Sequence, residues 1–450
     1  MHPNALPNWA GIFACPSCGR ELVSGPNELD CGGCKQAYPL LGSVPCLVPD
    51  PALWRALWSS RLDDYLEVTA SRIRHMRGET ELPGLLPRTR ARLQRIIEAK
   101  ERERTIIPEL LAPLRPATLD ASVPHAPSRP EALAGRLAVL EWYEHIFRDW
   151  AWGGAENARL AALVQSFVPR PLELLAVYGA GAGRLAFDVH RGLAPRRTVA
   201  LDLNPLPLLV AERMLQGDAL ELYEFPVAPT TDEHMVVLQR LSAPEKADSN
   251  GLCFAFGDGL KPPFAPGSLD AVLTPWFVDA IGVDLRVTAA LINRALKPGG
   301  LWLQVGPLNF NLQLSQTYLR EELADIVQSS GFELLSERRE RVPYFDSPVS
   351  GSWRQETVYC FAAEKRQEAP VPTLARASAP WVDNPRVPIA PSGDLMNLGR
   401  TSAFTALVLS LVDGQRSIID VAHAVAPHVG MDPGMLEHEL RAFFGKLPAS

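Results

Sequence analysis

Three closely spaced glycines, Gly179, Gly181 and Gly183, directly follow the apolar run of residues 174–178. Glycine permits left-handed backbone conformations and lets backbone amides approach a ligand closely. The chain after Gly183 is amphipathic, so the pattern predicts a buried strand, a tight turn and the start of a helix. The exposed amides and positive dipole end of such a helix favour a nucleotide-like ligand at the end of a parallel strand.

Two acidic residues follow later apolar runs. Asp202 ends the run that starts at Arg197, about 20 residues beyond the glycines, where a carboxylate can accept hydrogen bonds from ribose hydroxyls. Asp258 and Gly259 end the run that starts at Leu252, and we expect Asp258 to bind an adenine amino group. The glycine turn alone is a weak signal, but together with the two acids it predicts a nucleotide-like cofactor site.

Four cysteines near the N-terminus form two Cys-x-x-Cys pairs separated by twelve residues. Each pair directs two thiolates at one point, so the four predict a structural Zn²⁺ site. A segment of about 40 residues is too short to be stabilised by burial alone, and the metal would substitute for a core. Two disulfides are the alternative, which the lack of an export signal at the N-terminus does not favour. The four cysteines are Cys15, Cys18, Cys31 and Cys34.

The composition narrows the class of protein. The net charge of −7 does not favour broad nucleic-acid binding, which needs a basic surface. No run of about 18 apolar residues exists, so we predict no membrane-spanning helix and a cytoplasmic protein. Arginines over residues 88–104 are mixed with glutamates, and we favour a solvated, salt-bridged helix face over an RNA-binding patch.

The order of the elements predicts an α/β fold. Apolar runs alternate with amphipathic segments and indicate a doubly wound, mostly parallel sheet. The predicted parts are a zinc ribbon at 1–50, a helical connection with a Pro-rich linker at 51–130, the α/β domain at 131–365, a linker at 366–394 and a small, mainly helical domain at 395–450.

Together, the glycine turn, the acid at 202, the Gly-Asp at 257–258 and the Leu-Lys-Pro-Gly-Gly at 296–300 resemble class I S-adenosylmethionine-dependent methyltransferases. Arg-Asp-Trp at 148–150, the TPWFVDA motif at 274–280 and the segment 296–310 are more narrowly similar to the carnosine N-methyltransferase family. The resemblance implies that Asp279 faces the methyl-accepting group and that Asn311 stands where the family carries a histidine. The cofactor contacts that we carry over are Arg148, Gly179, Gly181, Gly183, Asp202, Asp258, Gly259 and Thr274. As a helix N-cap or surface acid, Asp279 has a simpler structural interpretation.

Two flanking segments resemble other modules. Residues 13–50 are similar to the zinc ribbons related to small activator subunits of tRNA and protein methyltransferases. The pattern over 411–422 resembles the winged-helix peptide-binding domains of the pyrroloquinoline-quinone chaperone type, with a generic three-helix domain as the alternative. Either flanking module could contact a protein partner.

These observations predict an S-adenosylmethionine-dependent N-methyltransferase. Its expected acceptor is an imidazole- or amine-containing small molecule or peptide. Two alternatives remain open: an RNA methyltransferase that docks its substrate through the zinc ribbon, and a catalytically inactive methyltransferase fold that binds partners.

Overall fold

The structure is a computed structural model that describes residues 9, 11–115, 139–244, 251–310, 312, 314–373, 380–390 and 403–445. The described residues up to Pro372 form one compact unit, and those from Thr373 onward form a second. The three parts that the sequence separated between residues 1 and 365 therefore pack as one unit.

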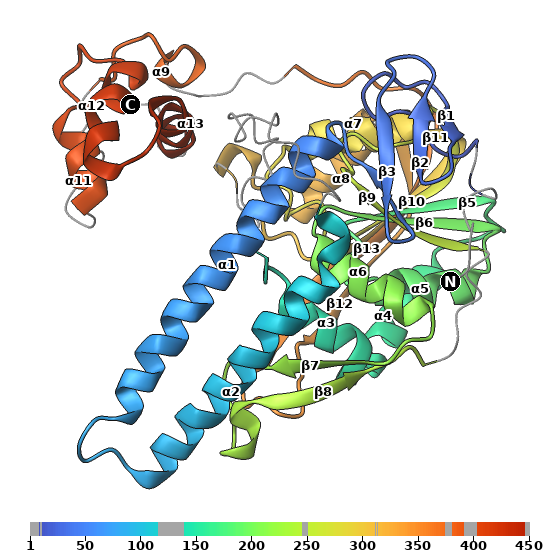
Figure 1. Cartoon of the computed structure of the whole chain (residues 1–450). Helices are drawn as coiled ribbons and strands as arrows, with labels where there is room; N and C mark the ends of the chain where they lie inside the picture. Colours follow the sequence, from blue (N-terminus) through green and yellow to red (C-terminus); the bar gives the residue numbers. More distant parts are fainter. Residues whose placement is uncertain are drawn as a thin grey trace. The chain divides into compact units, whose positions relative to one another are not determined.

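A mixed sheet of eleven strands runs through the larger unit (Figure 1). Its strand order is β1-β2-β3-β4-β9-β6-β5-β10-β11-β13-β12. The strands from β4 to β11 in this order pair in parallel, whereas β13 pairs antiparallel with both β11 and β12. The predicted mostly parallel, doubly wound sheet is confirmed. The strands are β1 (Leu22–Ser24), β2 (Glu28–Cys31), β3 (Ala37–Leu41), β4 (Val44–Leu47), β5 (Leu174–Tyr178), β6 (Arg197–Asp202), β9 (Leu252–Gly257), β10 (Leu269–Pro275), β11 (Leu296–Gly306), β12 (Phe332–Tyr344) and β13 (Arg354–Lys365).

Both faces of the sheet are covered, which explains the nearly continuous apolar runs of its central strands. Along β5, Leu175 and Val177 join one apolar cluster, and Ala176 and Tyr178 join another on the opposite face. Helices α1, α4, α5 and α6 contribute to the first cluster, and α7 and α8 to the second. The helices are α1 (Pro51–Thr80), α2 (Pro87–Leu110), η2 (Ala112–Leu114), α3 (Tyr143–Phe147), the π-helix η3 (Arg148–Trp152), α4 (Gly154–Ser166), α5 (Arg184–Leu193), α6 (Pro205–Leu215), η4 (Glu233–Met235), α7 (Leu285–Ala295), η5 (Leu314–Gln316) and α8 (Arg320–Ser329).

The strand order reverses at β5, which lies between β6 and β10. In open α/β sheets the crevice at the carboxyl ends of the strands on either side of such a switch point is the usual place for a ligand. The glycine turn follows β5 directly, so the fold places it at this crevice. The Lys-Pro-Gly-Gly residues 297–300 lie within β11 but are skipped by its pairing with β10, which passes from Leu296 to Leu301, and Gly299 has φ of 74°.

The N-terminal ribbon, residues 11–47, extends the central sheet. In β4, Cys46 pairs with Phe256 and Leu47 with Gly257 of β9, directly before Asp258. Beyond that acid, the amide of Ala14 donates to the carbonyl of Pro263 at 2.8 Å. The ribbon is therefore hydrogen-bonded to the chain on both sides of the Asp258 loop, residues 258–262.

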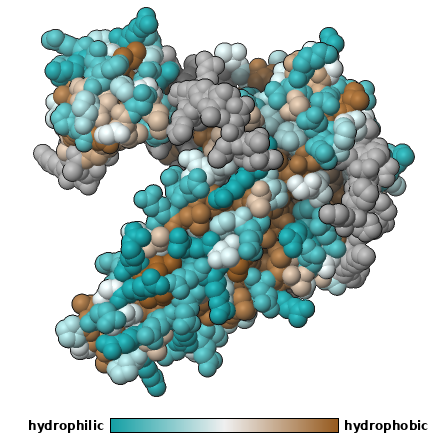
Figure 2. All heavy atoms as spheres, viewed as in Figure 1, coloured by the Kyte–Doolittle hydropathy of each residue, from teal (hydrophilic) through white to brown (hydrophobic). Residues whose placement is uncertain are grey.

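The long helices α1 and α2 pack side by side and project from the sheet (Figure 1). Charged pairs join neighbouring side chains along them, including Arg77 with Glu101 and Lys100 with Glu103. The face of this pair seen in Figure 2 is largely hydrophilic with scattered apolar side chains. Among the described residues, no helix is long and apolar enough to span a membrane.

Between α6 and β9, β7 (Leu220–Glu224) forms an antiparallel pair with β8 (Val237–Leu241). This pair is a separate two-stranded sheet. Phe225 to Val227 follow β7 and form part of a cavity wall described below.

The second unit is helical where it is described. Its core includes Trp381 and Ile389, which the sequence placed in a linker, because both large apolar side chains are buried against the helices. Its described residues hold one isolated bridge, Pro388 with Ser417, and no strand pair of the kind a wing requires. The helices are α9 (Pro380–Asp383), α11 (Ala403–Ser410), α12 (Ile418–Val429) and α13 (Pro433–Phe444).

Candidate functional site

The glycine turn has the backbone conformation that its sequence predicts. Gly179, Gly181 and Gly183 have φ angles of 71°, 57° and 84°. A Cβ atom on Gly183 would lie 2.6 Å from the Phe254 ring, so the turn packs tightly on β9 at that point. A Cβ atom on Gly181 would meet nothing within 4 Å, so the space over the middle of the turn is open.

This difference predicts unequal effects of two alanine substitutions. Gly183→Ala adds a steric clash to an unfavourable φ and should lower the free energy of unfolding by about 2–5 kcal/mol. Gly181→Ala carries only the backbone penalty of about 1–2 kcal/mol. Urea unfolding of both variants measures the difference, and equal losses would show that the packing on Phe254 is unimportant.

Asp202, at the end of β6, holds the middle of the glycine turn. Its Oδ2 accepts from the Gly181 amide at 2.7 Å, and its Oδ1 accepts from the Asn204 amide at 2.8 Å. Burial raises the pKa of Asp202, and the amides of Asn204 and Gly181 oppose that rise. Each carboxylate oxygen keeps further lone pairs, so Asp202 can also accept hydrogen bonds from a ligand.

Asp258 and Gly259 lie beyond β9, next to the glycine turn. The Asp258 Oδ1 accepts from the Leu260 amide at 2.8 Å, which fixes the loop. The Phe277 ring is wedged between the two turns: a Cβ atom would lie 2.8 Å from it on Gly179 and 2.7 Å on Gly259. Phe277 was not predicted as a site residue, because in the sequence only its place in the motif at 274–280 distinguishes it.

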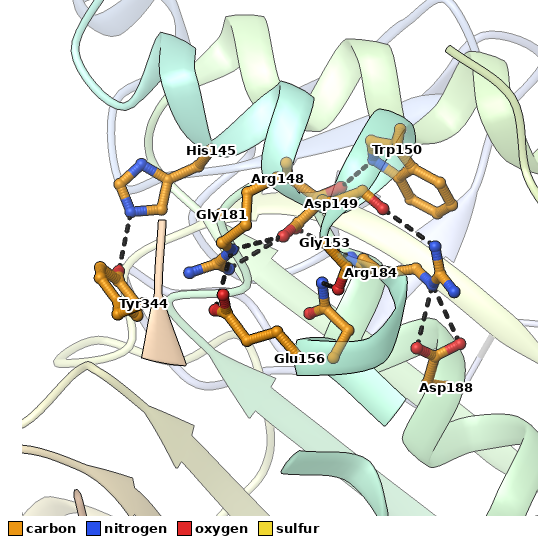
Figure 3. Close-up of polar contacts among 12 residues, drawn as sticks. His145, Arg148, Asp149, Trp150, Gly153, Glu156, Gly181, Arg184, Asp188 and Tyr344 are labelled. Carbon is orange, nitrogen blue, oxygen red and sulfur yellow. Dashed lines mark hydrogen bonds and ion pairs between the residues drawn. The ribbon is translucent and has the colours of Figure 1, made fainter. Parts of the chain in front are cut away.

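The π-helix η3 contains the Arg-Asp-Trp segment and is hydrogen-bonded to the glycine turn and to the start of α5 (Figure 3). The indole of Trp150 donates to the Ala182 carbonyl at 2.7 Å. Asp149 accepts from the Arg184 amide at 3.3 Å, at the start of α5, where a negative charge is favoured by the helix dipole. The Arg184 guanidinium donates in turn to the Asp149 carbonyl at 3.0 Å. Arg148 is thereby held beside the turn.

Arg148 is nearly buried among acids and rings. Its guanidinium lies 2.9 Å from an Asp149 oxygen and 3.8 Å from Glu156. Burial opposes its charge, but Asp149, Tyr344 and Glu156 outweigh that effect and raise the pKa of Arg148. The guanidinium also lies 5.2 Å from the centre of the Tyr344 ring. The structure therefore keeps a permanent cation next to the glycine turn.

Glu156, next to Arg148, is expected to change its protonation state near neutral pH. Burial, only partly offset by Arg148, raises the pKa of Glu156 to about 7. A carboxyl group whose folded-state pKa is raised stabilises the fold at low pH and loses that contribution as pH rises through the folded pKa.

We therefore expect Glu156→Gln to remove part of the pH dependence of folding. Between pH 5 and pH 8 the wild type should lose up to about 3 kcal/mol that the variant retains, because the variant cannot ionise at this position. Urea unfolding of both proteins across that range measures the difference. Parallel pH profiles would contradict the assignment.

The three remaining predicted site residues are Thr274, Asp279 and Asn311, and the structure describes the first two of them. Thr274 is fully buried, and its hydroxyl contacts the Gln304 side chain at 2.6 Å and the Trp302 indole at 2.9 Å. It thus stabilises the sheet interior and presents no surface to a cofactor, in contrast to its predicted role. Asp279 follows β10, is buried, and accepts from the Asn309 amide at 3.1 Å. Asn311 lies outside the described residues.

A cavity of about 560 Å³ lies beside the cluster of acids and rings around Arg148. Its walls are formed by the segment 140–152, the end of β7 with the loop after it, the β12–β13 connection, and Lys100 of α2. Phe345 lines the cavity, and its ring centre lies 5.7 Å from the Arg148 guanidinium. Neither Asp279 nor Thr274 is a wall residue. The sequence gives no sign of this cavity, because its walls come from four separate parts of the chain.

The four predicted cysteines form a second site. Their sulfur atoms all lie within 4.8 Å of one another, and all four thiols are free. Both Cys-x-x-Cys turns have the same form: Gly19 and Lys35, each with positive φ, donate to the carbonyls of Cys15 and Cys31. The Tyr38 hydroxyl lies 3.0 Å from the Cys15 sulfur. Four converging thiols with a supporting hydroxyl could hold a metal ion.

Comparison with known proteins gives distant structural likenesses, of which three are described here. No family model matches the sequence. No curated protein matches it either. A solved S-adenosylmethionine-dependent methyltransferase from Methanosarcina mazei is 14% identical, with a TM-score of 0.32, over 45% of this chain and 96% of that one.

Two other solved structures show a similar degree of likeness. A putative methyltransferase from Bacillus halodurans is 14% identical, with a TM-score of 0.32, over 48% of this chain and 100% of that one. A phosphoethanolamine N-methyltransferase from Haemonchus contortus, in complex with phosphomonomethylethanolamine and S-adenosylhomocysteine, is 20% identical, with a TM-score of 0.32, over 50% of this chain and 56% of that one. TM-scores and identities this low support no assignment of function.

Proposed function

We propose that this protein is an S-adenosylmethionine-dependent N-methyltransferase. The observation that carries the proposal is the hydrogen bond of Asp202 to Gly181 at the switch point of the sheet. It joins a glycine turn with open space above it to an acid placed for ribose hydroxyls. The motif resemblance in the sequence selects methyl transfer among the uses of such a site.

The residues present fit the cofactor. The open space over Gly181 admits a ligand, and Asp202 retains lone pairs for two ribose hydroxyls. Asp258 and Gly259 would contact the adenine, and Arg148 would balance the carboxylate of the methionine part. S-adenosylmethionine, when bound, supplies a methyl group on a sulfonium centre. The protein's contribution is positioning and the exclusion of water.

The proposed acceptor is an imidazole or amine nitrogen of a small molecule or peptide. Asp279 would hold the acceptor and direct its reacting nitrogen. The pKa of Asp279 is raised, because burial disfavours its charge more than the Asn309 amide stabilises it. A buried carboxyl group of this kind gains from a hydrogen-bond donor on the acceptor. Asn311 remains part of the proposal from its sequence position alone.

We further propose that the cysteine cluster binds a structural Zn²⁺ ion. Four thiolates without an open ligand position are typical of a structural site and not of a catalytic one. The ribbon would then stabilise the edge of the sheet, and it or the C-terminal unit would offer a surface for a protein partner. A cytoplasmic location belongs to the same proposal.

Incubation with methyl-labelled S-adenosylmethionine and a cell extract tests the substrate class. The extract is then divided into small-molecule, peptide and RNA fractions, with Asp202→Ala as the control for background transfer. We expect label in the small-molecule or peptide fraction. Label mainly in RNA would replace this proposal by the RNA methyltransferase alternative, and no transfer to any fraction would favour a non-catalytic binding protein.

A further inference from the structure

The cavity of about 560 Å³ adjoins the proposed cofactor site, and its size is typical of small-molecule sites. Glu141, in its wall, accepts through its carbonyl from the Asn204 side chain at 2.7 Å. Asn204 is the residue whose amide also binds Asp202. Phe345, which also lines the cavity, contacts Arg148 through the face of its ring. A ligand in this cavity would therefore lie beside the residues that hold the cofactor.

Aromatic rings dominate the walls. Trp142 and Trp152 come from the segment 140–152 and Trp353 from the β12–β13 connection, and all three line the same space. Trp142 and Trp353 are 44% and 52% exposed, although large aromatic side chains are normally buried. The faces of such rings attract cations, and several rings around one space form the usual cage for an organic ammonium group.

Two aromatic wall residues are held in unfavourable backbone conformations. Trp142 has φ of 63° and Phe345 has φ of 57°. The His145 ring packs edge-on against both, with centres 5.2 Å and 4.6 Å away. A left-handed conformation costs a non-glycine residue on the order of 1–3 kcal/mol and persists only where the surroundings fix it. The structure thus fixes these rings in place around the cavity.

The walls also carry an unbalanced negative charge. Glu224 is buried, and its carboxylate accepts from three neutral groups, Ser347 at 3.1 Å, Gln239 at 2.6 Å and Trp152 at 3.3 Å. Burial of Glu224 raises its pKa. Within the described part of the chain, Glu224 has no ion-pair partner, so a cation next to it would relieve an unfavourable buried charge.

The basic residues of the wall do not cancel this charge. Lys100 pairs with Glu103 at 2.7 Å, and Arg354 pairs with Glu356 at 2.8 Å. The wall acids Glu141 and Glu144 make no ion pair among the described residues. The Lys100 ammonium lies 3.6 Å from the centre of the wall ring of Phe225, so this cavity already stabilises one cation over an aromatic face.

We propose that this cavity binds an alkylammonium group of the methyl acceptor, held by Trp142, Trp353 and Glu224. The inference rests on the proposed function, because the cavity is assigned to the acceptor. The ammonium group is a recognition handle, and the reacting nitrogen is a separate, uncharged one. The acceptor is therefore an organic cation with a second nitrogen. This substrate class is narrower than the class of all imidazole- or amine-containing molecules.

Calorimetric titration of the full chain with choline and with its uncharged isostere, 3,3-dimethylbutan-1-ol, tests the cation site. We expect choline to bind at least about tenfold more tightly. Glu224→Gln and Trp353→Ala should each weaken choline binding about tenfold, whereas Glu221→Gln, at an exposed position of the same strand β7, should leave it unchanged. Circular dichroism confirms that each variant is folded, and Glu144→Gln replaces any that is not.

S-adenosylhomocysteine is titrated in the same series, so that the two proposals fail separately. Equal binding of choline and the alcohol, no binding of choline, or full choline affinity in the folded variants overturns the cation site. If S-adenosylhomocysteine still binds, the proposed function is unaffected by that result. Selective choline binding without S-adenosylhomocysteine binding supports the cation site and rejects the methyltransferase proposal.

Discussion

Replacing Asp202 with alanine should reduce the affinity for S-adenosylhomocysteine by about 100-fold or more. The variant loses the two ribose contacts that we assign to the carboxylate, and each hydrogen bond to a charged acceptor contributes about 1.5–3 kcal/mol. It also frees the amides of Gly181 and Asn204, which Asp202 binds at 2.7 Å and 2.8 Å. The glycine turn then loses the contact that fixes its middle.

Isothermal titration calorimetry of the wild type and the variant measures this effect. Asp325→Ala is the matched control, because Asp325 is an exposed acid on α8 on another part of the unit. It should bind S-adenosylhomocysteine like the wild type. An Asp202→Ala variant that is folded and binds within about threefold of the wild type would reject the assigned role of Asp202, since that ratio is under 1 kcal/mol.

Replacing Cys31 with serine should remove the metal and strongly destabilise the ribbon. Metal binding contributes about 10–16 kcal/mol to the folding of small zinc peptides, so a segment of this size depends on it. The loss should extend beyond the ribbon, because β4 pairs with β9 directly before Asp258 and Ala14 bonds to Pro263 beyond it. We therefore expect a lower melting temperature and weaker S-adenosylhomocysteine binding together.

Metal analysis, thermal unfolding and calorimetry of the same preparations test this coupling. Cys253→Ser is the matched control, because Cys253 lies on β9 itself but outside the cysteine cluster. It should retain one metal ion per chain. Unchanged metal content in Cys31→Ser would reject the metal site, and metal loss with unaltered ligand affinity would reject the link between the ribbon and the Asp258 loop.

The sequence predicted the sheet well, because its strands are encoded locally. Buried parallel strands are short, continuous apolar runs, and those ending at Tyr178, Asp202 and Gly257 are bounded by turn residues. The paired cysteines were equally readable, since their spacing alone brings four thiols together. The motif resemblance also placed Arg148 near the turn.

Features that depend on contacts between distant segments were not predicted. The ribbon appeared to be a separate module, yet β4 joins the sheet through Cys46 and Leu47, and nothing in their local pattern indicates a partner 210 residues away. The aromatic cavity also depends on contacts between distant segments. Its residues Trp142, Phe225 and Trp353 look like ordinary apolar residues when each is considered alone.

At some residues, composition or a motif position gives a different expectation from the structure. The proline-rich segment before residue 394 predicted a linker, but Trp381 and Ile389 anchor it in the second core. Thr274 matched a motif position, whereas its hydroxyl is fully used inside the sheet. Burial is set by the neighbours of a residue in space, which a motif does not specify.

The proposed function depends on the glycine turn and Asp202 forming a cofactor site. Calorimetric titration of the wild-type chain with S-adenosylhomocysteine tests for this site. We expect saturable binding of one molecule per chain with micromolar affinity. No binding at high micromolar concentrations, by a folded and metal-loaded protein, would contradict it.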